Sequence, residues 1–387
     1  MSSTPAAAPA RVASVDLIRG AVMILMAIDH VRVFSGVPAG GPDPAVFFTR
    51  WVTHFCAPAF IFFAGASAFF YGRTHRDLSR FLLTRGAWLV FLELTVIRVA
   101  WTFNFDFANY MLAGVIWVIG WCMITMALLV RLSPRVLGWI GVAIIVLHGA
   151  VMWPLVGLLP DSLALLRNIL YVGFFVDEPA RLWAGGPPLV VLYSFIPWIG
   201  VMAAGYGFGQ ILTLDAEHRD RLCRRIGLGA IVLFLVLRGT NLYGDPNPWS
   251  SDAPLTFLNT SKYPASLNFL LMTLGPTIAL IPLLERARGA AARFVTVFGK
   301  VPFFYYVLHI PLIHALALIV SQIRSPAATW WLFTNHPMGN PETPDGYRWP
   351  LPLLYLVFAI AVGLLYVACR WFADLKTRRK DWWLRYL

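Results

Sequence analysis

Charge is scarce in this chain of 387 residues, of which only 13% are Asp, Glu, Lys or Arg. Because a soluble domain carries roughly 25% charged residues, this shortage argues against a soluble fold. The sequence is instead 59% hydrophobic, with a mean hydropathy of +0.69. Apolar runs recur along the whole chain, each long enough to cross a hydrocarbon core of about 30 Å. We therefore expect an all-α, polytopic integral membrane helix bundle.

The chain also has few cysteines and no internal repeats. The four cysteines (Cys56, Cys122, Cys223 and Cys369) show no paired spacing, so neither a disulfide framework nor a zinc site is predicted. No His/carboxylate pair has ligand spacing on one helix, and we expect no metal. No two spans match each other, which disfavours an inverted-repeat transporter. The stretch "GYGFGQ" at 205–210 follows no strand, so its glycines favour close helix packing over phosphate binding.

The net charge of +12 reflects orientation rather than nucleic-acid binding. Basic residues gather in short runs between apolar segments, such as "GRTHRDLSRFLLTRG", "RLSPR", "EHRDRLCRR" and "ERARGAAAR". Every second connection is basic, which is the positive-inside pattern. We expect both termini in the cytoplasm, a multi-pass protein of the inner (cytoplasmic) membrane, membrane lipids as partners and no nucleic acid.

The apolar runs predict about ten spans in one transmembrane domain. A polar tail at 1–13 precedes this domain at 14–375, and a basic tail at 376–387 follows it. The N-terminal "AAAPA" lies before the first apolar run, whereas a signal-peptide cleavage site would follow it, so we expect that run to be retained. The predicted spans are 16–36, 51–72, 84–104, 111–131, 136–156, 187–211, 227–243, 264–284, 298–322 and 350–374.

The first span carries five ionisable residues, although each charge costs a few kcal/mol in a bilayer. They are Asp16, Arg19, Asp29, His30 and Arg32 in "SVDLIRGAVMILMAIDHVRVFSG". Eleven helical residues make three turns plus roughly 20°, so Arg19 and His30 share a face about 16 Å apart. Asp16 lies one turn before Arg19, near enough to pair with it.

These five side chains predict a function that joins the two sides of the membrane. The Arg19 guanidinium near the inner side can hold an anion such as a cofactor phosphate. The His30 imidazole near the outer side can take a proton from an attacking hydroxyl or amine, with Asp29 or Arg32 orienting it. The alternative is an internal ion-pair network that only locks the helix into the bundle.

Further polar groups lie in other predicted spans: His54, Glu93, Arg98, Arg238, His309 and His314. Each of them could line the same cavity or make a satisfied hydrogen bond between helices. His309 and His314 are five residues apart and point about 140° away from each other, so both cannot face one small site on a regular helix.

Several blocks of the sequence resemble a known family. "RVASVDLIRGAVMILMAIDHVR" is similar to the opening block of bacterial DUF1624 proteins, which share a domain with lysosomal heparan-α-glucosaminide N-acetyltransferase. "THFCAPAFIFFAGASAF", "YSFIPWIGVMAAGYGFG", "KYPASLNFLLMTLGP" and "FGKVPFFYYVLHIPLIH" resemble later blocks. The resemblance implies a transmembrane acyltransferase that moves an acyl group, expected to be acetyl, from cytosolic acyl-CoA to a glycan amine or hydroxyl on the far side.

The resemblance also implies roles for single residues. Acyltransferase-3 proteins of the wider superfamily have Arg, then His eleven residues later, in their first helix, and Arg19 and His30 match that spacing. The resemblance implies that His30 is the catalytic base and that Arg19 acts in donor binding or in the architecture of the site. The lysosomal enzyme instead has Asn at the position of His30 and a functional His in its first luminal loop. The matching loop here, "VPAGGPDPAVFFTR", has no His, so His54 stays open as a substitute base.

The predicted site has three parts. The catalytic residues are His30, Asp29 and His54; the acyl-CoA site contains Arg19, Asp16, Lys300 and His309; the acceptor site contains Arg32, Lys262 and Tyr263. Lys262 and Tyr263 could equally be interfacial anchors. The competing function is a secondary transporter or flippase that uses the buried charges as a proton relay. The sequence leaves open the acceptor, the acyl length, O- versus N-transfer and the oligomeric state, a homodimer included.

Overall fold

The computed structural model describes residues 12–173, 181–338 and 341–379, together with residues 381 and 384. It is 74% helical with almost no strand, which confirms the predicted all-α class. Two short strands, β1 (Met111–Ala113) and β2 (Leu189–Val191), pair in parallel. Most of the predicted N-terminal tail, and residues 380, 382–383 and 385–387 of the C-terminal tail, lie outside the described residues.

Six helical segments of the described chain are long and apolar enough to cross a membrane. They are α2 with α3 (Pro44–Trp51 and Cys56–Thr74, joined by the 3-10 turn Val52–Phe55), α7 (Pro134–Gly157), α9 (Phe195–Leu212), α11 with α12 (Leu267–Ala279 and Ile281–Glu285), α14 (Pro302–Arg324) and α15 (Leu351–Arg378). Because each covers a bilayer's thickness, the chain is a multi-pass membrane protein.

Helices also occupy the other four predicted spans. They are α1 (Ala13–Phe34), α4 with α5 (Leu78–Leu92 and Arg98–Thr102, joined by the π-helical turn Glu93–Ile97), α6 (Val115–Leu129) and α10 (Ala216–Thr240). α6 has only 15 residues, and the other three carry several charged side chains. The count of ten spans therefore stays a prediction.

Some helix boundaries differ from the predicted spans. The predicted span 51–72 already begins at Pro44, because the Asp43 carboxylate accepts a hydrogen bond from Ala45 N at 2.7 Å and caps α2. The predicted spans 111–131 and 187–211 open with β1 and β2, so α6 and α9 begin only at Val115 and Phe195. Pairing satisfies the backbone groups that face the partner strand, and both strands are largely buried in protein, which is where non-helical backbone is tolerated at membrane depth.

Small residues bring α3 and α9 into close contact. A Cβ atom at Gly65 would overlap the carbonyl oxygen of Met202, and one at Gly205 would overlap that of Phe62. Since α9 continues to Leu212, the glycines of 205–210 lie inside a helix. This confirms the packing interpretation of that stretch.

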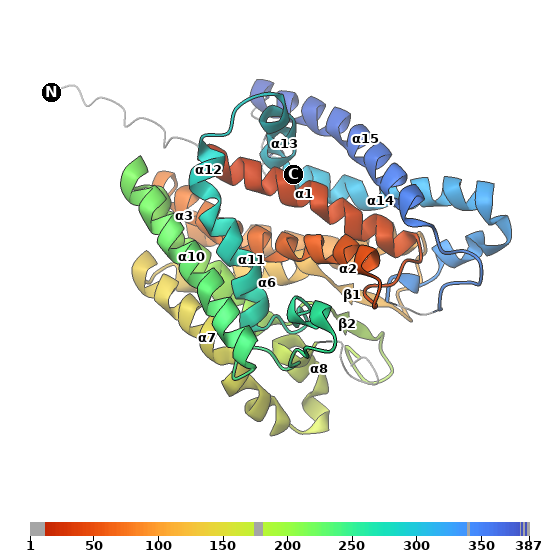
Figure 1. Cartoon of the computed structure of the whole chain (residues 1–387), viewed down its shortest axis with the longest axis horizontal. Helices are drawn as coiled ribbons and strands as arrows, with labels where there is room; N and C mark the ends of the chain where they lie inside the picture. Colours follow the sequence, from red (N-terminus) through yellow and green to blue (C-terminus); the bar gives the residue numbers. More distant parts are fainter. Residues whose placement is uncertain (1–11, 174–180, 339–340, 380, 382–383, 385–387) are drawn as a thin grey trace.

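α1 lies at the centre of the bundle (Figure 1). It packs against α3, α14, α15 and the short helix α13 (Ala290–Lys300). Gly20 faces the Val295 carbonyl on α13 so closely that a Cβ atom would not fit. The helix with the most unusual charge content is thus surrounded by protein, which lowers the cost of burying its ionisable groups.

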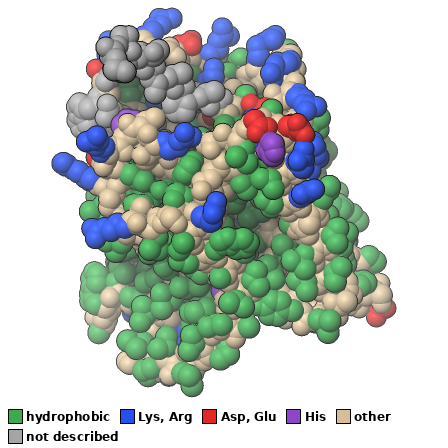
Figure 2. All heavy atoms as spheres, turned by 90° about the vertical axis from the view of Figure 1, so that its left-hand side faces the viewer, with side chains coloured by type: hydrophobic (Ala, Val, Ile, Leu, Met, Phe, Trp, Pro, Cys, Tyr) green, Lys and Arg blue, Asp and Glu red, His purple; other side chains and the backbone are tan. Residues whose placement is uncertain are grey.

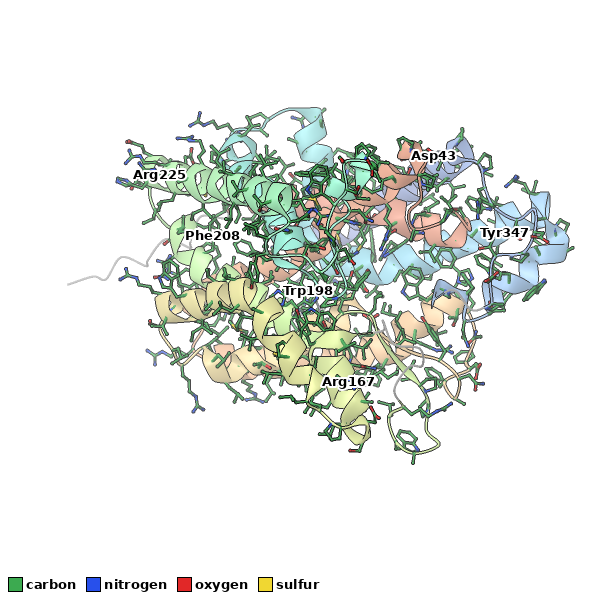
Figure 3. The ribbon with its side chains drawn as sticks, turned by 60° about the horizontal axis from the view of Figure 1, so that its bottom comes forward. Asp43, Arg167, Trp198, Phe208, Arg225 and Tyr347 are labelled. Carbon is green, nitrogen blue, oxygen red and sulfur yellow. The ribbon has the colours of Figure 1, made fainter. Side chains whose placement is uncertain are left out.

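One end of the bundle is where α1 begins and α15 ends (Figure 1). Arginines gather at this end. Figure 2 faces this end and shows Lys and Arg side chains over its upper part, with hydrophobic side chains over the lower part. The exposed arginines of its connections and adjoining helix turns include Arg73, Arg76, Arg80, Arg131, Arg135, Arg221, Arg224, Arg225, Arg286, Arg288 and Arg293. Arg225 lies at this basic end, whereas Asp43 and Tyr347 lie towards the opposite one (Figure 3). The side of the membrane that each end faces stays a prediction.

Candidate active site

α1 positions two groups of ionisable side chains at its two ends. Asp16 and Arg19 lie in its first two turns, at the basic end, and Asp29, His30 and Arg32 lie in its last two turns. α1 is a regular helix throughout, so Arg19 and His30 share one face as the spacing predicts. The structure therefore separates a cationic group and an imidazole along one helix.

His30 pairs with His309 of α14. His30 Nδ1 lies 2.6 Å from His309 Nε2, and the two ring planes are inclined by 25° with their centroids 4.7 Å apart. His309 Nδ1 lies 2.6 Å from the carbonyl oxygen of Tyr306. A carbonyl oxygen only accepts, so His309 Nδ1 carries a proton and, in the neutral ring, its Nε2 accepts. We assign the donated proton to His30 Nδ1, which leaves the lone pair on His30 Nε2.

This tautomer gives His30 the form that a general base needs. No hydrogen bond from another described residue reaches His30 Nε2. The edge of the His30 ring also meets the Trp101 ring, with centroids 4.7 Å apart, which fixes the ring plane. His309 thus lies beside His30, the expected base. The sequence prediction assigns it instead to the acyl-CoA site with Arg19.

Asp29 and Arg32 form a local ion pair. Arg32 Nε donates to Asp29 Oδ1 at 2.8 Å, and Arg32 Nη1 donates to the carbonyl oxygen of Val37 at 2.9 Å. Both side chains are largely buried, so each charge compensates part of the desolvation cost of the other. Asp29 is adjacent to His30 and can stabilise a positive charge on its ring.

A small cavity, here called the histidine pocket, lies beside His30 and has a volume of about 40 Å³. It is lined by Met26, Asp29, His30, Thr53, Cys56, Ala57, Phe60, Val115, Tyr193 and Lys262. The Lys262 ammonium lies 5.1 Å from the ring centroid of Tyr263 and 5.7 Å from that of Tyr193. Lys262 is 8% exposed, so it is a pocket residue here rather than an interfacial anchor.

A larger cavity of about 350 Å³, here called the arginine cavity, contains Arg19. Arg19 Nη2 donates to the carbonyl oxygen of Phe63 at 2.7 Å and to the Ser67 hydroxyl. Its other lining residues are Met23, Phe60, Ala64, Ala68, Tyr71, Phe81, Leu82, Arg85, Leu89, Val115, Ile116, Ile119, Met123, Pro302, Phe303 and Tyr306. The cavity is therefore apolar over most of its wall and has two guanidinium groups, those of Arg19 and Arg85.

The other predicted donor residues lie near the arginine cavity but outside its lining. Asp16 is buried, and its carbonyl oxygen touches Gly299 at the end of α13. Lys300 follows Gly299 and is exposed. Both lie at the basic end of the bundle, where a cation attracts an anion through solvent.

A third cavity, here called the outer cavity, has a volume of about 770 Å³ and lies against the turn before α3. Arg50, Trp51 and His54 line it together with Ala39, Gly40, Gly41, Pro42, Pro44, Phe47, Asp252, Ala253, Pro254, Leu255, Thr256 and Asn259. Arg50 Nε, Trp51 Nε1 and His54 Nδ1 are buried and have no hydrogen-bond partner among the described residues. Thr53 of the same turn lines the histidine pocket, so this turn separates the two cavities.

Arg98 and Arg238 hold loops rather than line these cavities. Arg98 donates to the carbonyl oxygens of Tyr110 and Asp106 among other acceptors, and Arg238 to those of Phe257 and Asn247 among others. These are satisfied hydrogen bonds, as our alternative interpretation of the intramembrane charges predicts.

His314 is separate from the histidine pocket. Its Nδ1 donates to the carbonyl oxygen of Ala100 at 3.1 Å, and its ring stacks on Phe34 and Phe103. This confirms that His309 and His314 face different surroundings.

Sequence reasoning missed several lining residues. Arg85 looked like the end of a basic loop, but it lies two turns inside α4 and faces the arginine cavity. Tyr193 and Thr53 carry no charge and gave no signal. An arginine followed at once by the apolar run "GAWLVFL" was the one available clue to Arg85.

Among the described residues, no group of three or more His, Cys, Asp or Glu side chains is arranged to hold a metal ion. The family model for the heparan-alpha-glucosaminide N-acetyltransferase catalytic domain matches residues 11–242, more than half of the chain. The chain belongs to this family. A comparison with curated proteins gave no match.

The family match assigns the chain to membrane acetyltransferases and covers α1 to α10. Arg19, His30, His54 and Arg85 fall inside the matched region, whereas Lys262 and His309 fall outside it. For this acetyltransferase family member, the pairing of His30 with His309 is thus a finding of the structure alone.

Proposed function

We propose that the protein transfers an acyl group from acyl-CoA to the amine or hydroxyl of an acceptor, with His30 as general base. The observation that carries this proposal is the pairing of His30 Nδ1 with His309 Nε2. It leaves the Nε2 lone pair of a pocket-lining histidine ready to accept a proton. Membership of an acetyltransferase family supports the same chemistry and favours acetyl as the acyl group.

The reaction needs one nucleophilic attack and two proton transfers at His30. The acceptor nitrogen or oxygen attacks the thioester carbonyl carbon and forms a C–N or C–O bond, while His30 Nε2 takes its proton. The C–S bond then breaks, and His30 returns the proton to the leaving CoA thiolate. Asp29 stabilises the protonated ring between the two steps. General-base help of this kind contributes typically about 10²–10⁴-fold in rate.

The arginine cavity supports binding of the donor. Its apolar wall fits a pantetheine arm, and Arg19 and Arg85 offer two guanidinium groups to phosphate oxygens. Asp16 supports the α1 end of this site, and exposed Lys300 at the basic end attracts the anionic donor before it binds. In this arrangement the donor enters from the cytoplasm.

The opposite end of the bundle supports binding of the acceptor. Lys262, Tyr263 and Arg32 lie at or next to the histidine pocket and can orient the acceptor. The outer cavity, with Arg50, Trp51 and His54, provides an approach to that pocket from outside the membrane. A glycan fits such a wall, because its hydroxyls accept hydrogen bonds and its ring faces stack on aromatic side chains.

Labelled acetyl-CoA added to proteoliposomes tests this function against transport. We use glucosamine as the acceptor probe inside the vesicles. The proposal predicts loss of the thioester outside and acetylated glucosamine inside. Accumulation of intact acetyl-CoA or free acetate, with glucosamine unmodified, would instead identify a transporter.

A further inference from the structure

One face of α3 is built almost entirely from small residues. Ala57, Ala64, Ser67 and Ala68 follow each other at helical spacing and line either the histidine pocket or the arginine cavity. Phe60 is a large residue within this run, between Ala57 and Ala64, and Tyr71 follows Ala68 at the other end of the α3 lining. The small residues on either side of Phe60 therefore leave its ring as the large α3 side chain between the two cavities.

Phe60 lies at the junction of the two cavities. Phe60 and Val115 are the two residues that line both the arginine cavity and the histidine pocket. Phe60 comes from α3, and Val115 is the first residue of α6. These two side chains thus form the boundary that an acyl group must pass between the arginine cavity and the histidine pocket.

Both sides of this junction are held in place. The contacts of Gly65 and Gly205 fix α3 against α9 one turn from Phe60. Glu93 Oε2 accepts a hydrogen bond from Ile116 N at 3.1 Å, next to Val115. Gly114 leaves room for the Glu93 carboxylate, which a Cβ atom at that position would overlap. Rigid backbone on both sides means that the side chains set the width of the passage.

The space beyond the junction is small. The histidine pocket has a volume of about 40 Å³, against about 350 Å³ for the arginine cavity. A water molecule needs roughly 10–15 Å³ of such volume, so the pocket accepts about three or four atoms of that size. An acetyl group has three heavy atoms and fits, whereas a butyryl or longer acyl group has five or more and must displace Phe60 or Val115.

We infer that Phe60 and Val115 together limit the length of the acyl group that reaches His30, admitting acetyl and excluding butyryl and longer chains. This inference rests on the proposed acyl transfer and identifies the residues that determine its donor specificity. Longer acyl-CoAs still enter the larger cavity, but their carbonyl carbon stops short of His30. Chain length is therefore expected to affect kcat more than KM.

Turnover of acetyl-, butyryl- and hexanoyl-CoA by the purified protein tests the inference. Hydroxylamine serves as a small acceptor, released CoA thiol is measured, and the rate without protein is subtracted. The wild type should prefer acetyl-CoA to hexanoyl-CoA by about 100-fold or more in kcat/KM. Phe60→Ala and, as a milder second variant, Val115→Ala should each reduce this preference by about tenfold or more.

Ile119→Ala is the matched control, because Ile119 lies one turn beyond Val115 and lines only the arginine cavity. It should leave the chain-length preference unchanged. A wild type that uses the three donors equally, or a preference that both junction variants retain, would overturn the inference while acyl transfer stands. Absence of protein-dependent CoA release with every donor would overturn the proposed function itself.

Discussion

The residues of the candidate site come together from distant parts of the sequence. His30 and His309 are 279 positions apart and touch through their ring nitrogens. Arg19 and Phe63 are 44 positions apart and share a hydrogen bond. In each case one partner is a residue of α1, so α1 is the element on which the site is assembled.

His309 should act as a positioning residue for His30. His309→Phe removes the acceptor of the His30 Nδ1 proton, so the tautomer is no longer fixed and kcat should fall by about tenfold or more. His309→Gln keeps an acceptor oxygen and should recover part of the rate. The pH profile of kcat/KM distinguishes this role from packing: it should move in His309→Phe and stay near that of the wild type in His309→Gln. Identical profiles in all three proteins would contradict the role.

Arg19 should contribute to donor affinity. Arg19→Ala removes a guanidinium from the arginine cavity, and binding of acetyl-CoA in detergent, measured by calorimetry, should weaken by about tenfold. Arg135→Ala is the control, since Arg135 is exposed at the basic end and does not line the cavity. Unchanged affinity in a folded Arg19→Ala protein would leave Arg19 with a structural role.

At the scale of elements, glycines decide how closely helices approach. Gly205 of α9 meets the Phe62 carbonyl of α3, whereas a Cβ atom at Gly229 of α10 would meet nothing within 4 Å. The same substitution should therefore have opposite effects at the two positions.

Gly205→Ala should destabilise the protein by about 1–3 kcal/mol or more, because the added methyl group forces α3 and α9 apart. Gly229→Ala should stabilise it by roughly 0.5–1 kcal/mol, through the higher helix propensity of alanine. Thermal unfolding in one detergent compares the two. Equal midpoints would show that α3 and α9 do not pack as described here.

The elements also show what sequence alone could predict. Apolar runs located the helices, but they could not distinguish β1 and β2 from helix, because a short buried strand is as apolar as a buried helix. The eleven-residue spacing placed Arg19 and His30 on one face, since helix geometry is local. The packing of α14 on α1, and thus the contact of His309 with His30, depends on long-range contacts that no local pattern encodes. Arg85 was missed because the start of α4 falls seven residues before it.

The orientation of the whole molecule in the membrane decides whether a cytosolic donor can reach the arginine cavity. Reporter fusions after Arg76 and after Leu214, both in connections at the basic end, should behave as cytoplasmic. A fusion after Asp252, beside the outer cavity, should behave as external. The reverse result would place the arginine cavity on the wrong side for a cytosolic donor.

The most direct test of the central claim is CoA release from acetyl-CoA by His30→Ala with hydroxylamine as acceptor. We predict that the His30→Ala protein folds, binds acetyl-CoA as the wild type does and turns over at least about 100-fold more slowly. His314→Ala should lose much less, because His314 lies outside the histidine pocket. Near-normal turnover in His30→Ala, together with its loss in His54→Ala, would contradict the account and assign the base to the turn before α3.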